Sequence, residues 1–499
     1  MLIEDLFVSF ELFFSFQNIF AIFIGVVIGT ITGAIPGMTT VMGVALALPF
    51  TFSLPPVTGI LLLLGIYKGG LYGGSITAIL LKAPGTPAAS CTVLDGFPMA
   101  QRGEGQRALD IALYSSCVAD FISNISLILL TGFLATYALR FGPPEFATLI
   151  IFSLTIIAGV SGDDLARGIF AACAGLILAT VGLDIIYGTD RFIFGEYELL
   201  AGVNFIPVLI GLFALPEIIN YYTKKADGRD KVKQLGQKGA SFADFRKCLK
   251  SIIRGSVIGV ILGVIPGIGG APSAFLSYSE AKRTSKNKDN FGKGEIEGVA
   301  AAEAGNNGVA GSTMIPLIAL GVPGDVVTAI ILGAFMIHGL QPGPVMFSQN
   351  LTIVYAIFIG ILFSSFFLFL VGKGSIRTIS KLSNISNDIL YPVVLVLCIF
   401  GAYAINNNTF DILVMALMSI FGFLLLRLKI PAAPFLIAFI LGPLLEDSFR
   451  QSLLLSRGDY QIFFRSYICI VFWALTALSF TFLILGQFRV NPKIKNLKT

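Results

Sequence analysis

The sequence predicts an all-α polytopic membrane protein made of two inverted repeats, and three observations predict this fold. The first is composition: 55% of the residues are hydrophobic and 13% are charged, with a mean hydropathy of +0.86. The second is a glycine motif that occurs once in each half of the chain. The third is a reversal of Lys and Arg content between the loops that follow the two motifs. Soluble domains carry roughly 25% charged residues, so the composition excludes a soluble fold.

Membrane-crossing helices are predicted wherever an apolar run approaches the ~20 residues that span a bilayer. Such runs recur along the chain, for example at 111–139, 147–160, 170–186, 351–371 and 468–485. They are continuous, whereas the strands of a transmembrane barrel alternate over ~10 residues. The N-terminus is acidic and lacks the positive region of a cleavable signal, so we expect its first segment to be retained. Six cysteines without CxxC spacing predict neither a metal site nor a disulfide framework.

The repeats are visible as two matching segments. Residues 25–37 read GVVIGTITGAIPG and residues 255–267 read GSVIGVILGVIPG, with nine of thirteen positions identical. A looser match follows in each half, where Gly-Ser and Pro-Gly pairs recur at 74–75 and 84–85, and at 311–312 and 323–324. Similarity this dense indicates an ancestral duplication.

The positive charges predict that the two repeats have opposite orientations, because Lys and Arg concentrate in cytoplasmic loops. Residues 51–56 carry none, whereas residues 282–293, at the matching place in the second half, carry five. Arg102 and Arg107 follow the first Pro-Gly pair, whereas residues 338–350 have no Lys or Arg. We therefore expect a first repeat at 1–223, a cytoplasmic basic linker at 224–250 and a second, inverted repeat at 251–499. Each repeat has a re-entrant hairpin-like motif and about five spans.

The same pattern assigns sides to the remaining charges. It places Arg140, Arg191, Arg450, Arg457 and Arg465 outside, and Lys373, Arg377, Lys381, Arg427 and Lys429 inside. The formal net charge of +5 is thus explained by topology and does not indicate nucleic-acid binding. Inverted repeats with sites near the membrane midplane are typical of secondary transporters.

The Ile-Pro-Gly that ends each glycine motif predicts a break in a helix at membrane depth. Proline lacks a backbone donor and glycine tolerates positive φ, and a break inside a bilayer must line a cavity. We expect hairpin tips at 34–40 and 264–272. Half-helix ends there suit a carboxylate or Na⁺. The candidate residues of these tips are Pro36, Gly37, Thr39, Thr40, Pro266, Gly267, Gly269 and Gly270. The other glycines of each motif, at four-residue spacing, are equally well explained by close helix packing.

A second group of candidates lies where Gly, Ser, Thr and Asn interrupt otherwise apolar helices. Their side chains offer neutral oxygens for Na⁺ or donors for carboxylates, although for any single Ser or Thr a hydrogen bond between helices is the better explanation, and only the cluster as a whole is specific. The group contains Ser75, Thr77, Asn306, Asn307, Ser312 and Thr313, with Thr86 and Asp325 beside the breaks at Pro84, Gly85, Pro323 and Gly324.

Ionisable residues inside a membrane are functional candidates by default, and here they are Lys68, Asp120 and Glu303. Lys68 and Glu303 occupy near-equivalent repeat positions, which suggests that they form a pair. His338, the one histidine, is expected in an external loop.

At these residues the chain resembles the TctA-type large membrane subunit of the tripartite tricarboxylate transporters. The resembling stretches are 33–40, 72–87, 95–109, 263–278, 291–325 and 337–344. Family members more often have a neutral residue at Lys68 and Lys82 and a small one at Asp325.

The resemblance implies a multi-pass protein of the bacterial inner membrane. It implies two partners, a TctB-type small membrane subunit and a TctC-type periplasmic solute-binding protein. It also implies uptake of citrate-like carboxylates, driven by an ion gradient, in the first instance Na⁺, without ATP or a cofactor. Coupling to H⁺ with another organic anion and a channel-like pore remain alternatives, as does a scaffold subunit. The sequence has no GxxxxGK[ST] phosphate loop and no GxSxG or HExxH motif, so an enzyme is not expected.

Overall fold

The computed structural model describes residues 2–35, 37–160, 164–184, 186–223, 238–382 and 387–490. Helices dominate these residues, and eight of them are long and apolar enough to cross a membrane. The prediction of an all-α polytopic membrane protein is therefore confirmed at this level. The predicted linker falls partly on residues 224–237, which lie outside the described residues, and a helix begins at Phe242.

The first half of the chain contains nine α-helices, two short 3₁₀ helices and a small hairpin among the described residues. The elements are α1 (Leu2–Phe13), α2 (Phe16–Gly33), α3 (Thr40–Ala47), η1 (Leu48–Ser53), α4 (Pro56–Leu81), α5 (Ala89–Gln101), α6 (Gly105–Ala138), α7 (Pro143–Val160), α8 (Leu165–Ala179), β1 (Gly182–Leu183), β2 (Asp190–Arg191), η2 (Tyr197–Leu199) and α9 (Phe205–Thr223).

The regular elements among the described residues of the second half are all helices, and several short helices follow one another near its middle. The elements are α10 (Phe242–Val264), α11 (Gly270–Thr284), η3 (Lys288–Asn290), α12 (Ile296–Asn307), α13 (Val309–Ser312), α14 (Met314–Leu320), α15 (Val326–Ile337), α16 (Pro344–Gln349), α17 (Leu351–Leu382), α18 (Asn387–Tyr403), α19 (Thr409–Arg427), α20 (Ala432–Leu455), α21 (Ile462–Arg465) and α22 (Tyr467–Val490).

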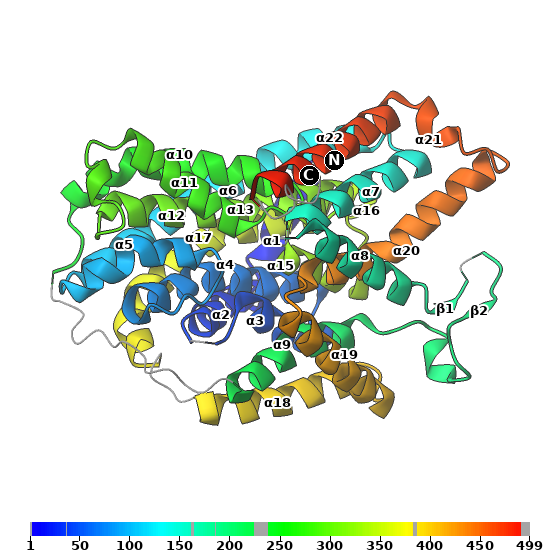
Figure 1. Cartoon of the computed structure of the whole chain (residues 1–499), viewed down its shortest axis with the longest axis horizontal. Helices are drawn as coiled ribbons and strands as arrows, with labels where there is room; N and C mark the ends of the chain where they lie inside the picture. The colour runs from blue at the N-terminus through cyan, green and yellow to red at the C-terminus, as the bar shows by residue number, and fades with distance from the viewer. Residues whose placement is uncertain are drawn as a thin grey trace, which may run out of the picture.

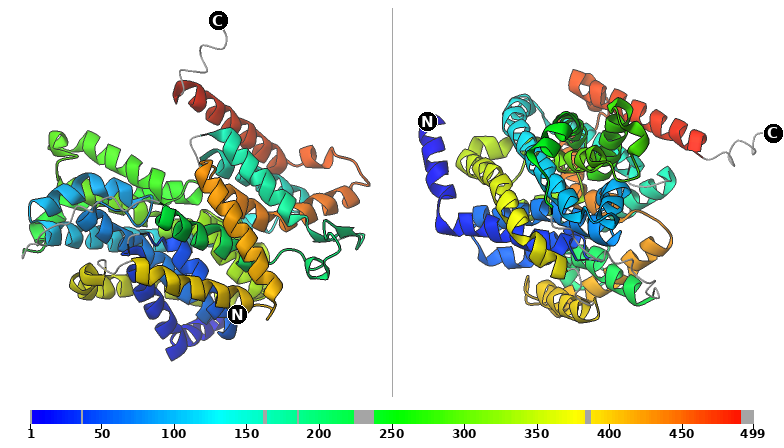
Figure 2. Two further views of the ribbon diagram at one scale, coloured as in Figure 1. Left: turned by 60° about the horizontal axis from the view of Figure 1, so that its bottom comes forward. Right: turned by 90° about the vertical axis from the view of Figure 1, so that its left-hand side faces the viewer.

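Helix α4 forms the centre of the molecule and α22 lies at its edge. In the most apolar 18-residue window of α4, 94% of the residues are buried, against 6% in α22. Figure 2 shows α22 on the outside of the bundle. In Figure 1, α5 and α10–α12 gather at one end of the molecule and the β1–β2 hairpin lies at the other. The exposed apolar side chains of α22 suit lipid, because little protein covers them.

The matching glycines of the two halves allow matching pairs of helices to touch. A Cβ added at Gly29 of α2 would lie 2.1 Å from the Ile66 carbonyl oxygen of α4. In the second half, a Cβ at Gly259 of α10 would lie 2.7 Å from the Cα of Gly308, between α12 and α13. Small residues at four-residue spacing therefore serve close backbone packing, as expected for helices in a membrane.

One predicted helix is shorter than its apolar run. The run at 170–186 continues past the end of α8 at Ala179, and the chain then forms the antiparallel β1–β2 hairpin. Gly182 has φ +116°, which a helix cannot contain. Asp184 accepts the backbone N–H groups of Ile186 and Tyr187 at 2.9 and 2.8 Å, and a short acidic side chain of this kind stabilises a turn.

Candidate functional site

Both helix breaks predicted at Ile-Pro-Gly are present. Helix α2 ends at Gly33 and α3 begins at Thr40, and Gly37 between them has φ +91°. Helix α10 ends at Val264 and α11 begins at Gly270, with φ +86° at Gly267. Pro36 lies outside the described residues, and whether the two breaks are tips of re-entrant hairpins stays a prediction.

The two Pro-Gly pairs also lie in helix breaks. Helix α4 ends before Lys82, which adopts a left-handed φ of +53°, and α14 ends before Gly321 at φ +72°. The second break contacts the second glycine motif directly, because the N–H of Gly267 donates to the carbonyl oxygen of Gly324 at 2.7 Å. Segments from different parts of the chain are thereby held side by side.

These breaks surround a cavity of about 500 Å³ that receives residues from both halves of the chain. Four helices begin at its wall, namely α3, α5, α11 and α15. The lining residues are Thr39, Thr40, Val41, Tyr67, Leu71, Thr86, Pro87, Ala88, Gly267, Ile268, Gly269, Gly270, Ala271, Pro272, Asn306, Asp325, Val326, Val327, Ala433 and Ile437. The first turn of a helix carries a partial positive charge and N–H groups without a partner in the helix, so the ends of α3, α5 and α11, which have no acidic cap, favour an anion in this cavity.

The four helix ends differ in how their N–H groups are satisfied. Thr39 accepts the N–H of Met42 in α3, and Thr86 accepts that of Ala89 in α5, both at 3.2 Å. Asp325 accepts the N–H of Thr328 at 2.8 Å and caps α15 with a full negative charge. Helix α11 has no side-chain cap, because its N-cap residue is Gly269. Its first N–H groups are therefore the ones most available to a ligand.

Two buried oxygens at the cavity have no hydrogen-bond partner in the described structure: the Thr40 hydroxyl and the amide oxygen of Asn306. Thr40 is 4% exposed and Asn306 is 0% exposed. An unpaired buried polar atom costs about 1–3 kcal/mol, so such atoms in a cavity indicate a place where a ligand supplies the missing contact.

Tyr67 joins α4 to the cavity wall. Its hydroxyl donates to Asp325 at 2.8 Å and lies 3.3 Å from the hydroxyl of Thr313. The Asp325 carboxylate is therefore engaged on both oxygens, by Tyr67 and by the first turn of α15.

The structure divides the predicted site residues into two sets. Eight of them line the cavity: Thr39, Thr40, Thr86, Gly267, Gly269, Gly270, Asn306 and Asp325. The lining does not include Gly37, Ser75, Thr77, Pro84, Gly85, Pro266, Asn307, Ser312, Thr313, Pro323 or Gly324. Several of these satisfy backbone groups, as Thr77 does with the Gly74 carbonyl at 3.2 Å and Ser312 with that of Gly308 at 3.0 Å.

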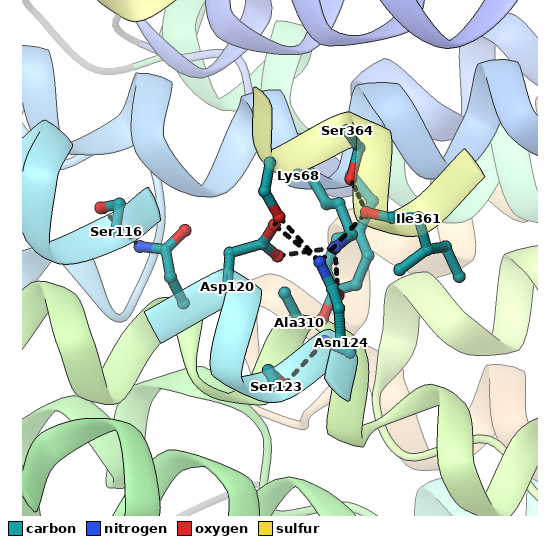
Figure 3. A network of polar contacts seen from close by, with 12 residues as sticks. Lys68, Ser116, Asp120, Ser123, Asn124, Ala310, Ile361 and Ser364 are labelled. Atoms are coloured by element: carbon teal, nitrogen blue, oxygen red, sulfur yellow. Dashed lines mark hydrogen bonds and ion pairs between the residues drawn. The ribbon is translucent and has the colours of Figure 1, made fainter. Parts of the chain in front are cut away.

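The predicted pairing of Lys68 with Glu303 is wrong. Lys68 donates to Asp120 and to the amide oxygen of Asn124, each at 2.6 Å, and Figure 3 shows these three side chains facing one another. Both charges are 1% exposed. Asn124 and Asp120 are also bound by Ser365 of α17, so the pair joins α4, α6 and α17.

Glu303 has hydroxyl partners instead. Its carboxylate accepts Ser75 of α4 at 2.6 Å, Thr92 of α5, and Ser116 of α6 at 3.1 Å, and it is 0% exposed. Among the residues that the structure describes, no Lys or Arg forms an ion pair with it. Repeat symmetry led to the wrong pairing, because it brings together equivalent positions without showing which neighbours fill the space between them.

Sequence reasoning missed Tyr67, Thr92, Ser116, Asn124 and Ser365. One signal for some of them was present, since Ser116, Asp120 and Asn124 follow one another at four-residue spacing in an apolar helix and therefore lie on one face. His338 ends α15 and its Nε2 lies 3.3 Å from the hydroxyl of Thr51.

Comparisons with known proteins agree on one family. The sequence model described as "Tripartite tricarboxylate transporter TctA family" matches residues 19–437. An Agrobacterium vitis protein, described as an uncharacterized 52.8 kDa protein in the TAR-I ttuC' 3' region, is 37% identical over 93% of this chain and 92% of its own length. A second, described as an uncharacterized protein in the TAR-II ttuC' 3' region of the same organism, is 38% identical over 41% of this chain and 85% of its own length. No solved structure matches the chain.

Proposed function

The chain belongs to the TctA family, the membrane subunits of tripartite tricarboxylate transporters, and on that premise we propose that it imports citrate-like carboxylates with Na⁺. The family is one of transporters and not of enzymes. In the proposed function, a TctC-type binding protein delivers the carboxylate on the periplasmic side of the bacterial inner membrane, and a TctB-type small subunit completes the complex. Family membership is the support for both partners.

The observation that carries the substrate class is the cavity at four helix N-termini. Its lining contains no Lys or Arg among the described residues, so the attraction for an anion comes from backbone N–H groups and helix dipoles. Its volume of about 500 Å³ lies within the ~300–1,000 Å³ typical of small-ligand sites. The unpaired Thr40 hydroxyl can donate to a carboxylate of such a substrate, and the unpaired amide oxygen of Asn306 can accept a substrate hydroxyl.

Contacts across the chain support the inverted topology that this function needs. Arg102 donates to the carbonyl oxygens of Lys293 and Gly294, and all three are predicted inside. Thr51 contacts His338, and Arg191 binds Glu446 one turn before Arg450, on the predicted outer side. Two breaks from each half contribute to one cavity, as expected for a carrier that works by alternating access.

Uptake into proteoliposomes tests the proposal. The complex with its small subunit and binding protein is assayed with labelled citrate and a panel of di- and tricarboxylates, under an imposed Na⁺ or H⁺ gradient. We expect uptake that requires the binding protein and disappears when the Na⁺ gradient collapses. Uptake with H⁺ alone would contradict Na⁺ coupling, and no uptake of any carboxylate by a folded complex would contradict the substrate class.

A substitution in the cavity ties the activity to this site. Asn306→Asp adds a fixed negative charge beside the uncapped end of α11, which should repel a carboxylate and lower its affinity by about tenfold or more. Asn287→Asp, in an exposed loop before η3, is the matched control and should leave uptake unchanged. Equal uptake by both variants would place the substrate elsewhere.

A further inference from the structure

The carboxylate of Glu303 lies where three helices of the first half meet α12 of the second. Four polar side chains approach it: Ser75 and Thr92 at Oε1, and Ser116 and Asn307 at Oε2. Every one of the five side chains is at most 1% exposed. We call this set the Glu303 cluster.

The Glu303 cluster differs from the buried site of Asp120 by one charge. Asp120 is neutralised by Lys68 at 2.6 Å, whereas the partners of Glu303 are all uncharged. A carboxylate buried in a low-dielectric interior without a counter-charge costs several kcal/mol, and buried charges are therefore paired or bind a cation. The structure thus supplies an internal cation at one carboxylate and none at the other.

The chemistry of the cluster suits a small, hard cation. Ser75, Thr92 and Ser116 all belong to helices, where a hydroxyl can donate to the carbonyl group one turn earlier in its own helix. Each hydroxyl can therefore turn its hydrogen away from Glu303 and present its oxygen to a cation. Together with the carboxylate, these hydroxyls offer a cation a set of oxygen ligands, the type of site in which transporters hold Na⁺, while the Asn307 amide stays a hydrogen-bond donor to Oε2.

We propose that the Glu303 cluster binds the Na⁺ that is transported with the substrate. The inference rests on the proposed function and names the site of its coupling ion. Asn306 lies between Glu303 and Asn307 in α12 and lines the cavity, so a cation at Glu303 orders the segment that presents Asn306 to the substrate. Occupation of the ion site should therefore raise the affinity of the cavity for a carboxylate, and the reverse must also hold.

Binding of ²²Na⁺ to the purified full-length protein in lipid nanodiscs tests the proposal, with choline replacing Na⁺ in the reference buffer. Glu303→Gln should weaken Na⁺ binding by about tenfold or more, and Ser75→Ala and Thr92→Val should each weaken it several-fold. Ser364→Ala and Thr131→Val are matched controls, because both hydroxyls are buried and donate to a carbonyl of their own helix. We expect Na⁺ binding by both to equal that of the wild type.

The possible results distinguish an error in the Na⁺ site from an error in the proposed function. Wild-type Na⁺ affinity in Glu303→Gln, or absence of Na⁺ binding by the folded wild type, would overturn the site. If Glu303→Gln does not fold, the Ser75→Ala/Thr92→Val double variant decides in the same way. Proton uptake at Glu303 with unchanged Na⁺ affinity in the hydroxyl variants would also overturn it. Citrate-dependent thermal stabilisation is measured in parallel, and its absence beside intact Na⁺ binding would contradict only the substrate class.

Discussion

At the scale of single residues, the buried charges of Lys68 and Asp120 must be compensated by their neighbours. Both charges are removed from water and compensated by each other and by Asn124 and Ser365. Lys68→Met should lower the free energy of unfolding by about 3–5 kcal/mol, because it leaves the buried Asp120 carboxylate without a counter-charge. The thermal midpoint of the purified protein in detergent measures the loss.

The double variant is the control for that prediction. Lys68→Met combined with Asp120→Asn removes both charges and keeps an acceptor for Ser365, so most of the lost thermal stability should return. A double variant as unstable as the sum of the two single ones would show that the residues act independently.

A second residue-scale prediction concerns pH. The backbone N–H groups of Tyr187 and Ile186, together with Arg450, hold the pKa of Asp184 below its usual value. A group whose pKa is depressed by folding stabilises the folded state above its unfolded pKa of about 3.9, and this contribution is lost as the pH falls through the folded pKa. Between about pH 5 and about pH 2 the thermal midpoint of wild type should therefore fall further than that of Asp184→Asn. Parallel curves would contradict this.

A site residue can be predicted from the sequence when local backbone conformation determines its place, and not when tertiary packing does. Gly267 and Gly269 could be predicted, because a proline and positive-φ glycines break a helix wherever they occur. Thr92 and Ser365 could not, since a single Ser or Thr in an apolar helix usually bonds its own backbone, and only packing shows the exception. The pairing of Lys68 with Asp120 could not be predicted either, because the two residues are 52 positions apart in the sequence.

At the scale of elements, close contact between α2 and α4 depends on the absence of side chains. Gly29→Ala would place a Cβ 2.1 Å from the Ile66 carbonyl oxygen, so the helices must separate, at a cost of about 1–3 kcal/mol. Gly132→Ala in α6 is the matched control, because nothing lies within 4 Å of its added Cβ and alanine favours a helix. We expect a lower thermal midpoint for the first and an unchanged or higher one for the second.

The connection between α5 and α12 depends on one carboxylate. Asp95, fully buried, accepts the backbone N–H groups of Gly292, Gly294 and Glu295 at 2.7–2.9 Å, and the Tyr278 hydroxyl at 2.8 Å. Asp95→Ala leaves these donors unpaired, at about 1–3 kcal/mol for each that stays buried. Its thermal midpoint should drop well below that of Asp289→Ala, an exposed aspartate of the same segment. Similar midpoints would mean that water replaces the carboxylate.

The apolar runs of the sequence predict most of the long helices, but not where each helix ends. The apolar runs predicted helices correctly in α6, α7, α17 and α22, because burial and lipid contact both require apolar faces. The run at 170–186 predicted a helix that continues beyond Ala179, but the chain turns there, because Gly182 has a positive φ and Asp184 stabilises a turn.

At the scale of the whole molecule, the predicted inversion of the two repeats assigns each loop to one side of the membrane. Tyr187, between β1 and β2, and Arg283, in α11, are 77% and 74% exposed, and Figure 1 shows the β1–β2 hairpin and α11 at opposite ends of the molecule. In a cysteine-free background, Tyr187→Cys should react with an impermeant maleimide from outside intact cells. Arg283→Cys should react only after the membrane is permeabilised. Labelling of both from the same side would contradict the inverted repeats.

The contrast between Asp120 and Glu303 has an electrical consequence. Asp120 is paired with the ammonium of Lys68, so the pair has no net charge on which the membrane potential could act. With the proposed Na⁺ site, Glu303 carries one net negative charge whenever the cation has left. If the cation leaves into the cytoplasm, the return of the empty site moves this charge outward, and an inside-negative potential assists it by up to about 2.3 kcal/mol per 100 mV. The voltage of the cell would then drive the resetting of the carrier.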